Sequence, residues 1–159
     1  MYSLNSYRNS NDMINKDCEG IYFEKEIKDS DYQYIKNIIN KTELSSHEIK
    51  KYHFYVIKNN EWNVIAFGRI YEIWYKQMEI SSLRVNEDQR WKKLWIKIIQ
   101  ELIKDKKLDN GVYLACKRDL ENYYNKIWFK TIDRDIPEKL IHTGIWAKSQ
   151  WIDFIIMKL

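Results

Sequence analysis

Residues 79–95 read Glu-Ile-Ser-Ser-Leu-Arg-Val-Asn-Glu-Asp-Gln-Arg-Trp-Lys-Lys-Leu-Trp, and this stretch decides the fold. Its first half belongs to a strand expected over residues 78–85, and its second half opens a helix expected from residue 90 to about residue 106. A strand that turns into a helix beside basic side chains is a general phosphate site, because free backbone N–H groups and the helix dipole both favour an anion. The apolar stripe of the helix consists of Leu94, Ile98, Ile99, Leu102 and Ile103.

The rest of the chain adds strands and helices on both sides of this stretch. N-cap candidates at residues 29–31 predict a first helix, the capping-box spacing of residues 45–48 predicts a short second one, and residues 119–127 predict another. We therefore expect an α/β (α+β) fold, a twisted mixed sheet of six or seven strands flanked by helices on both faces. Alternating or continuous apolar residues predict the other strands at residues 21–27, 53–58, 64–73, 112–116 and 152–157.

Length and composition are those of one ordinary globular domain. The chain has 159 residues, of which 45% are hydrophobic and 31% charged, and we expect one domain over residues 20–159. Residues 1–19 are polar and rich in Asn and Ser, which predicts a flexible tail and not a signal peptide. No apolar run approaches the length of a membrane span. Cys18 and Cys116 form no spaced pair, so free thiols and a cytoplasmic location are expected.

The charge and the aromatic content leave other interpretations to consider. A net charge of +4 suits nucleic acid or a phosphorylated cofactor, but a solvated lysine-rich surface gives the same value. Aromatic residues reach 15%, as in some binders of single-stranded nucleic acid. The tyrosines are scattered without basic–aromatic alternation, so we expect no nucleic-acid partner. Because no apolar run is long enough to span a bilayer, we expect no membrane partner either. The histidines His47, His53 and His142 lack ligand spacing, so no metal site is expected.

The stretch over residues 79–95 resembles the signature segment of the GNAT (Gcn5-related) N-acetyltransferase superfamily. In that family a strand ends in a bulge and runs into a loop of the form Gln/Arg-x-x-Gly-x-Gly/Ala, which opens a helix. A second block, Tyr-Tyr-Asn-Lys-Ile-Trp-Phe at residues 123–129, resembles the later family segment that ends in Gly-Phe. The resemblance implies the GNAT acyl-CoA N-acyltransferase fold, with a sheet that splays between residues 78–85 and 112–116 to admit acetyl-CoA.

The resemblance also implies roles for individual residues. Tyr124 takes the position of the general acid that protonates the leaving thiolate, and Glu79 takes that of the base that deprotonates the amine. An ordinary structural alternative exists for each, a core aromatic for Tyr124 and a solvated or paired charge for Glu79. Lys117 stands where the family often has an Asn. The implied cofactor-binding residues are Leu83, Arg84, Val85, Arg90, Trp91, Lys92, Lys93, Leu94, Trp95 and Lys117.

The implied function is transfer of an acetyl group from acetyl-CoA to a primary amine of a small molecule or protein, by direct attack in a ternary complex. Residues 135–140, Asp-Ile-Pro-Glu-Lys-Leu, are weakly similar to amino-acid acetylating members. The alternative is a non-catalytic GNAT-fold binding or regulatory module with an impaired acetyl-CoA site, because Trp91 and Trp95 would obstruct the loop amides. A monomer or a homodimer is expected.

Glycine is scarce in this chain and tryptophan is abundant. The sequence has 4 Gly and 7 Trp, whereas an average glycine usage of about 7% corresponds to roughly 11, which is their sum. Trp62 lies in a polar hairpin turn and Trp128 directly follows a predicted helix, and both are positions that favour glycine. Trp91 and Trp95 fall in the loop where the family has glycines.

We hypothesise that these tryptophans are glycines of the encoded protein. The codon UGA is one base from GGA, and some bacterial codes read it as glycine while others read it as tryptophan. A genuine tryptophan-rich protein is the alternative. Under the hypothesis, Trp62, Trp74, Trp146 and Trp151 should lie on turns or near the surface, the last two flanking a polar loop at residues 147–150.

Overall fold

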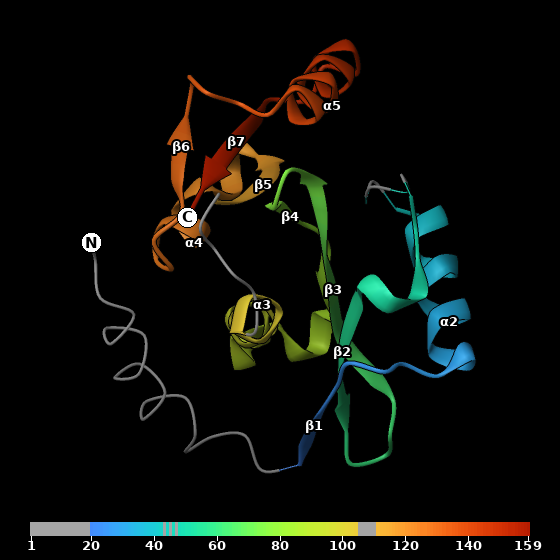
Figure 1. Ribbon diagram of the computed structural model, residues 1–159. Helices are drawn as coiled ribbons and strands as arrows, with labels where there is room; N and C mark the ends of the chain where they lie inside the picture. Colours follow the sequence, from blue (N-terminus) through green and yellow to red (C-terminus); the bar gives the residue numbers. More distant parts are fainter. Residues whose placement is uncertain (1–19, 43, 45, 47, 105–110) are drawn as a thin grey trace.

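The computed structural model describes residues 20–42, 44, 46, 48–104 and 111–159, and it contains one mixed seven-stranded sheet of order β1-β2-β3-β4-β5-β7-β6 (Figure 1). The neighbouring strands are antiparallel except for the central pair, β4 and β5, which is parallel. The predicted α/β sheet is thus confirmed, and it has seven strands where six or seven were expected. The strands are β1 (Ile21–Glu24), β2 (Phe54–Asn59), β3 (Val64–Trp74), β4 (Gln77–Val85), β5 (Val112–Lys117), β6 (Lys130–Ile132) and β7 (Phe154–Lys158).

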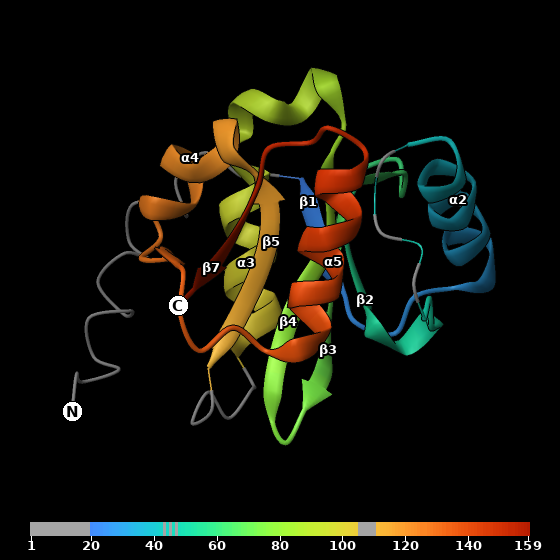
Figure 2. The same cartoon turned by 90° about the horizontal axis from the view of Figure 1, so that it is seen from above.

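Helices cover both faces of the sheet. Two α-helices, α2 (Asp29–Asn40) and α5 (Glu138–Ser149), lie on one face, and α3 (Leu94–Lys104) and α4 (Glu121–Asn125) lie on the other (Figures 1 and 2). Three 3-10 helices complete the described elements: η2 (Lys51–His53), η3 (Glu87–Lys92) and η4 (Arg118–Leu120).

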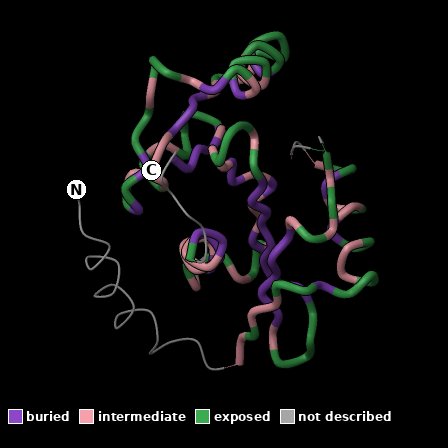
Figure 3. The backbone as a smooth tube through the Cα atoms, in the orientation of Figure 1, coloured by how far each residue is buried: buried purple, intermediate pink, exposed green. Residues whose placement is uncertain are grey.

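Successive side chains along a strand point to opposite faces of the sheet, as β5 shows. Val112, Leu114 and Cys116 of β5 join the large core cluster under α3, whereas Tyr113 packs with Leu140 of α5. The period of two is that of a strand buried on both faces. Figure 3 shows that the buried residues run through the central strands and along the inner side of α3.

Several sequence-based boundaries were wrong or fall outside the described residues. The helix predicted from Arg90 begins as η3, and α3 starts only at Leu94, because Lys93 has a left-handed backbone. Both β6 and α5 were missed, and the loop predicted at residues 147–150 is largely the end of α5. The predicted tail at residues 1–19 and residues 45 and 47 of the capping box lie outside the described residues. The short helix predicted from residue 45 was wrong at Ser46 and at residues 48–50, which are described and not helical. Within the described ranges, no helix has the length and apolarity that a bilayer crossing needs.

Lys58 is a buried charge that the fold pairs with two carboxylates. Its Nζ lies 2.8 Å from Glu24 Oε2 and 2.7 Å from Asp31 Oδ2, so the lysine links β2 to β1 and to the first turn of α2. Burial alone lowers the pKa of Lys58, but hydrogen bonds and charges from Asp31 and Glu24 outweigh burial and raise that pKa. The lysine therefore stays charged, and removing it would leave two carboxylates without their cation.

Replacement of Lys58 should show how much these ion pairs contribute to the free energy of unfolding. Lys58→Met should lower the free energy of unfolding by about 3 kcal/mol, because breaking one side of a buried pair leaves the other charge uncompensated. Urea unfolding followed by circular dichroism measures the change. The triple variant Lys58→Met, Glu24→Gln, Asp31→Asn should recover most of the loss, and an unchanged midpoint in Lys58→Met would show that the ion pairs contribute nothing.

Candidate active site

The two central strands separate part-way along their length. β4 and β5 pair at Met78↔Val112, Glu79↔Tyr113 and Ile80↔Leu114, and this described pairing ends there although both strands continue. β4 remains paired with β3 up to Val85, with an extra residue in its register where Ser82 has a φ of 51°. An extra residue in one strand is a β-bulge, which bends the strand locally. The splay and the bulged strand end are therefore both present in the structure.

The segment after β4 contains a left-handed residue beside exposed basic side chains. Lys93 has a φ of 52°, in the left-handed region that favours glycine, and this residue separates η3 from α3. Arg90 and Lys93 are exposed, and Arg90 Nη2 lies 3.5 Å from Glu87 Oε1. Leu94 is buried beneath them in the core. The loop thus offers cations at the N-terminus of α3, where the helix dipole adds further attraction for an anion.

Tyr124 lies on the α3 side of the sheet, packed against the core cluster that contains Cys116. The ring of Trp95 stands edge-on to that of Tyr124, with 6.0 Å between ring centroids. Burial raises the pKa of the Tyr124 phenol, and its interaction with Cys116 raises it further. The hydroxyl is therefore protonated throughout the physiological pH range, as a proton donor must be before it acts.

Glu79 points to the opposite face, where it is buried. It lies directly opposite Tyr71 of β3, and the Tyr71 hydroxyl donates a 2.6 Å hydrogen bond to Glu79 Oε2. Burial and the Glu79 carboxylate raise the pKa of Tyr71, so this phenol remains a donor. The sequence positioned Glu79 on the strand but did not predict this partner.

Tyr71 is itself surrounded by charged and aromatic groups. The Arg69 guanidinium lies 4.9 Å from the centre of its ring, Lys139 Nζ lies 5.0 Å from it, and the His53 ring stacks on it at 5.5 Å. Lys139 Nζ also lies 3.2 Å from Glu48 Oε2, so an ion pair between α5 and the segment after α2 spans this region. Two carboxylates, from Glu79 and Glu48, and two cations, from Arg69 and Lys139, thus lie around Tyr71.

Comparisons with known proteins agree on the fold. No protein-family model matches the chain, and no curated protein matches its sequence. N-acetylglutamate synthase from Neisseria gonorrhoeae, complexed with coenzyme A and N-acetyl-glutamate, matches 87% of this chain and 35% of its own, with a TM-score of 0.65 at 9% identity. Rv2747 from Mycobacterium tuberculosis, in complex with CoA, matches 87% of this chain and 98% of its own, with a TM-score of 0.67 at 12% identity.

A third solved structure carries the family name. An acetyltransferase of the GNAT family from Staphylococcus aureus Mu50 matches 87% of this chain and 99% of its own, with a TM-score of 0.61 at 17% identity. The chain has the GNAT fold. Seven strands, a parallel central pair that splays, and helices on both faces are what the sequence led us to expect of that fold.

The GNAT fold brings together some of the predicted site residues and separates others. Tyr124 and Trp95 meet in one cluster with residues of β4 and the start of α3, whereas Glu79 lies across the sheet. Lys117 is exposed at the end of β5, opposite Phe154 of β7. The predicted residues that share the cluster with Tyr124 are Leu83, Val85, Leu94 and Trp95.

The residues around Glu79 had only a weak signal in the sequence. Arg69 and Tyr71 stand two positions apart in a strand that is otherwise apolar from Val64 to Tyr71, and this spacing puts both on one face. Glu48 and Lys139 come from segments far apart in the chain, so no local pattern predicts that they meet. In the described ranges, no cluster of His, Cys, Asp or Glu has the composition of a metal site.

Cys116 should be unreactive in the folded protein. Burial, with smaller effects from Glu121 and Asp119, raises the pKa of its thiol from 9.0 to about 12, and the thiolate is the nucleophile. Iodoacetamide at pH 8 should therefore leave the Cys116 peptide unmodified in the native state and label it in urea, as measured by peptide mass spectrometry. Rapid native-state labelling at that pH would show that the thiol is accessible and ionised.

Proposed function

We propose that this chain is a GNAT N-acetyltransferase that transfers an acetyl group from acetyl-CoA to a primary amine. The supporting observation is the splay of β4 from β5 beyond Ile80 and Leu114, next to the bulge at Ser82. Beyond Ile80, one edge of β4 faces away from β3 with no described strand pairing. An extended chain that carries amide groups, such as the pantetheine arm of coenzyme A, can bind such an edge as an added strand does.

The residues present fit the phosphate end of the coenzyme as well. Arg90, Lys92 and Lys93 gather at the start of α3, and the left-handed Lys93 gives the backbone the turn that an amide cradle needs. Bound there, acetyl-CoA supplies the thioester whose acetyl group is transferred. Leu83 and Val85 would lie along the pantetheine arm, as the resemblance implies.

Glu79 is proposed as the base for the incoming amine. In the transfer, the C–S bond of the thioester breaks and a C–N bond forms, while the nitrogen of the neutral amine loses one proton. Glu79 accepts that proton, directly or through water. Tyr71 holds one carboxylate oxygen by its 2.6 Å hydrogen bond, so it orients Glu79 without touching the reacting atoms.

Tyr124 is proposed as the acid for the departing sulfur. The thiolate needs one proton, and the Tyr124 hydroxyl donates it, so the protons balance. Because burial raises the pKa of this phenol, it is a weak acid, and close hydrogen bonding to the thiolate must promote the transfer. The acid and the base then act from opposite faces of the splayed sheet.

Tyr124→Phe should show whether the Tyr124 hydroxyl acts in the chemical step or in acetyl-CoA binding. Turnover with acetyl-CoA and a panel of amino acids, polyamines and lysine peptides should fall by roughly a hundredfold or more, whereas acetyl-CoA affinity should change little, because the hydroxyl acts at thiolate departure. Thiol release measures turnover and calorimetry measures affinity. An unchanged rate would remove Tyr124 from the mechanism.

Glu79→Gln and Tyr71→Phe test the other half of the site. Glu79→Gln should lower turnover by roughly a hundredfold or more at neutral pH, because the amide cannot accept the proton. Tyr71→Phe should lower turnover less and shift the pH dependence of kcat, because it changes the environment of the carboxylate and not the base itself. Identical pH profiles for Tyr71→Phe and the unsubstituted protein would rule out the positioning role.

One observation favours the second candidate, a non-catalytic GNAT-fold module. The indole of Trp95 packs against the rings of Tyr123 and Tyr124, at 5.8 and 6.0 Å between centroids. A bulky ring at this family glycine or alanine position stands next to the proposed acid. Failure of acetyl-CoA to bind under any condition would favour this alternative.

A further inference from the structure

Trp128 occupies a backbone position that favours glycine. The Phe129 N–H donates to the Tyr124 carbonyl at 3.2 Å, and the Trp128 N–H donates to the Asn125 carbonyl at 3.2 Å. These two bonds form a Schellman motif at the end of α4, with Trp128 at the C′ position. Its φ of 69° lies in the left-handed region, as the motif requires.

Trp151 repeats the same arrangement at the end of α5. The Ile152 N–H donates to the Ala147 carbonyl at 3.0 Å, and the Trp151 N–H donates to the Lys148 carbonyl at 3.1 Å. Trp151 therefore takes the C′ position of a second Schellman motif, with a φ of 59°. Two helices in one chain thus end on a left-handed tryptophan.

Trp62 holds the corresponding position in a hairpin. The Trp62 N–H donates to the Asn59 carbonyl at 2.9 Å, and the Asn59 N–H donates to the Asn63 carbonyl at 3.1 Å. This pattern is a three-residue β2–β3 loop whose last residue is left-handed, and the φ of Trp62 is 62°. Glycine is the usual residue there, because the position forms a G1 bulge.

A tryptophan at these positions adopts an unfavourable backbone, and at position 151 it gains almost nothing from burial. The left-handed backbone destabilises a residue that carries a Cβ by about 1–2 kcal/mol. The exposed fractions of Trp62, Trp128 and Trp151 are 54%, 49% and 97%. Trp62 recovers part of the loss by stacking on Tyr22 at 5.0 Å, but Trp151 is almost fully in solvent.

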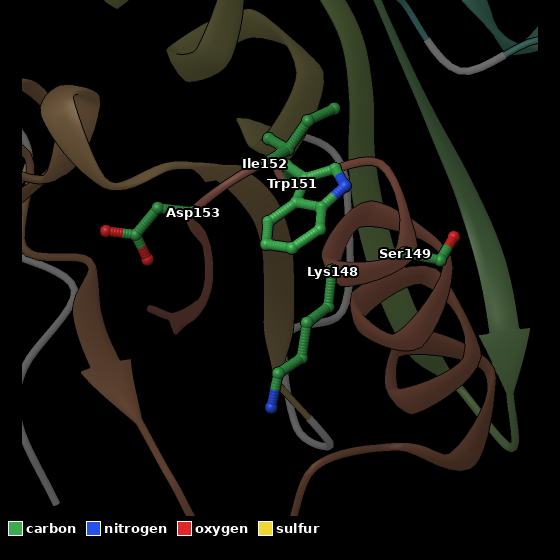
Figure 4. A pocket seen from close by; sticks show the side chains of 5 residues that line it. All are labelled: Lys148, Ser149, Trp151, Ile152 and Asp153. Carbon is green, nitrogen blue, oxygen red and sulfur yellow. The ribbon is translucent and has the colours of Figure 1, made fainter.

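The pocket at the end of α5 depends on the same residue. It is lined by Lys148, Ser149, Trp151, Ile152 and Asp153. Figure 4 shows the indole of Trp151 beside Ile152 and Asp153, where it forms part of the pocket lining. Glycine at position 151 would remove that part of the lining.

We propose that positions 62, 128 and 151 hold glycine in the protein that the cell makes, because UGA codons of the gene are read there as glycine. Tryptophan has the bulkiest side chain, and its presence in three unrelated turns of types that favour glycine is unexpected. The expected exposure of Trp62, Trp74, Trp146 and Trp151 is confirmed at 54%, 74%, 57% and 97%. Trp74 and Trp146 have no left-handed backbone, so their codons alone decide their identity.

We extend the proposal of encoded glycine to positions 91 and 95, in the loop before α3 and at the start of that helix. This extension rests on the proposed function. Glycine at positions 91 and 95 would leave Arg90, Lys92 and Lys93 around a backbone without indoles. It would also remove the ring of Trp95 from the side of Tyr124. Pyrophosphate could then approach the loop amides to hydrogen-bond distance.

The gene and the native protein provide the direct test. We expect UGA at codons 62, 128 and 151, and glycine in the corresponding peptides when the protein is purified from its own organism and sequenced by mass spectrometry. UGG codons, or tryptophan in those peptides, would overturn the proposal.

Stability provides a test that is independent of function. Trp151→Gly should raise the midpoint of thermal unfolding by about 2–4 °C, because it relieves the left-handed backbone and removes a side chain that is almost fully in solvent. Trp151→Ala should raise it less, because alanine keeps the Cβ that the left-handed backbone disfavours. Trp146→Gly is the matched control and should lower the midpoint, because that position lies inside α5. Equal losses in Trp151→Gly and Trp146→Gly would contradict the backbone argument.

Acetyl-CoA titration separates this proposal from the proposed function. The double variant Trp91→Gly, Trp95→Gly should bind at least about a hundredfold more tightly than the chain as written, because amide–phosphate bonds become available. Trp62→Gly should leave the affinity unchanged. If the codons are UGA and the double variant still does not bind, the recoding stands and the acetyl-CoA function fails. Equal binding by both chains would overturn the extension to positions 91 and 95.

Discussion

β4 and β5 hydrogen-bond to each other at three residue pairs and then diverge. A parallel sheet normally continues its ladder, because unpaired backbone groups are unfavourable unless something else satisfies them. Here the divergence coincides with the bulge at Ser82, so β4 turns away from β5 while it stays paired with β3. The proposed cofactor position depends on this interrupted ladder.

The sheet also divides the proposed chemistry into two environments. On the α3 face, Tyr124 packs among aromatic and aliphatic side chains, which favours the neutral phenol. On the α2 face, Glu79 lies among charged and polar groups that include Tyr71 and Arg69. An acid that must keep its proton and a base that must lose one thus have different surroundings.

The sequence predicted what depends on local pattern. The long strands, the stripe of α3 and the order of the main elements followed from periodicity, because each buries one face of its own. β6 and α5 were missed, since three residues carry no period and α5 buries only Leu140 and Ala147. The residues around Tyr71 were missed because they come from β3, β4, η2, α5 and the segment that contains Glu48, and such a meeting is a property of the tertiary fold.

The ion pair between Glu48 and Lys139 joins two parts of the molecule that lie on either side of the splay. Glu48 belongs to the half built on β1–β4, and Lys139 to the half built on β5–β7. The pair lies beside Tyr71, level with the paired end of β4 and β5. That end is therefore joined twice, by the backbone hydrogen bonds between β4 and β5 and by an ion pair. Because no described pairing joins β4 to β5 beyond Ile80, we expect the amides beyond that point to exchange hydrogen sooner than those of the paired end.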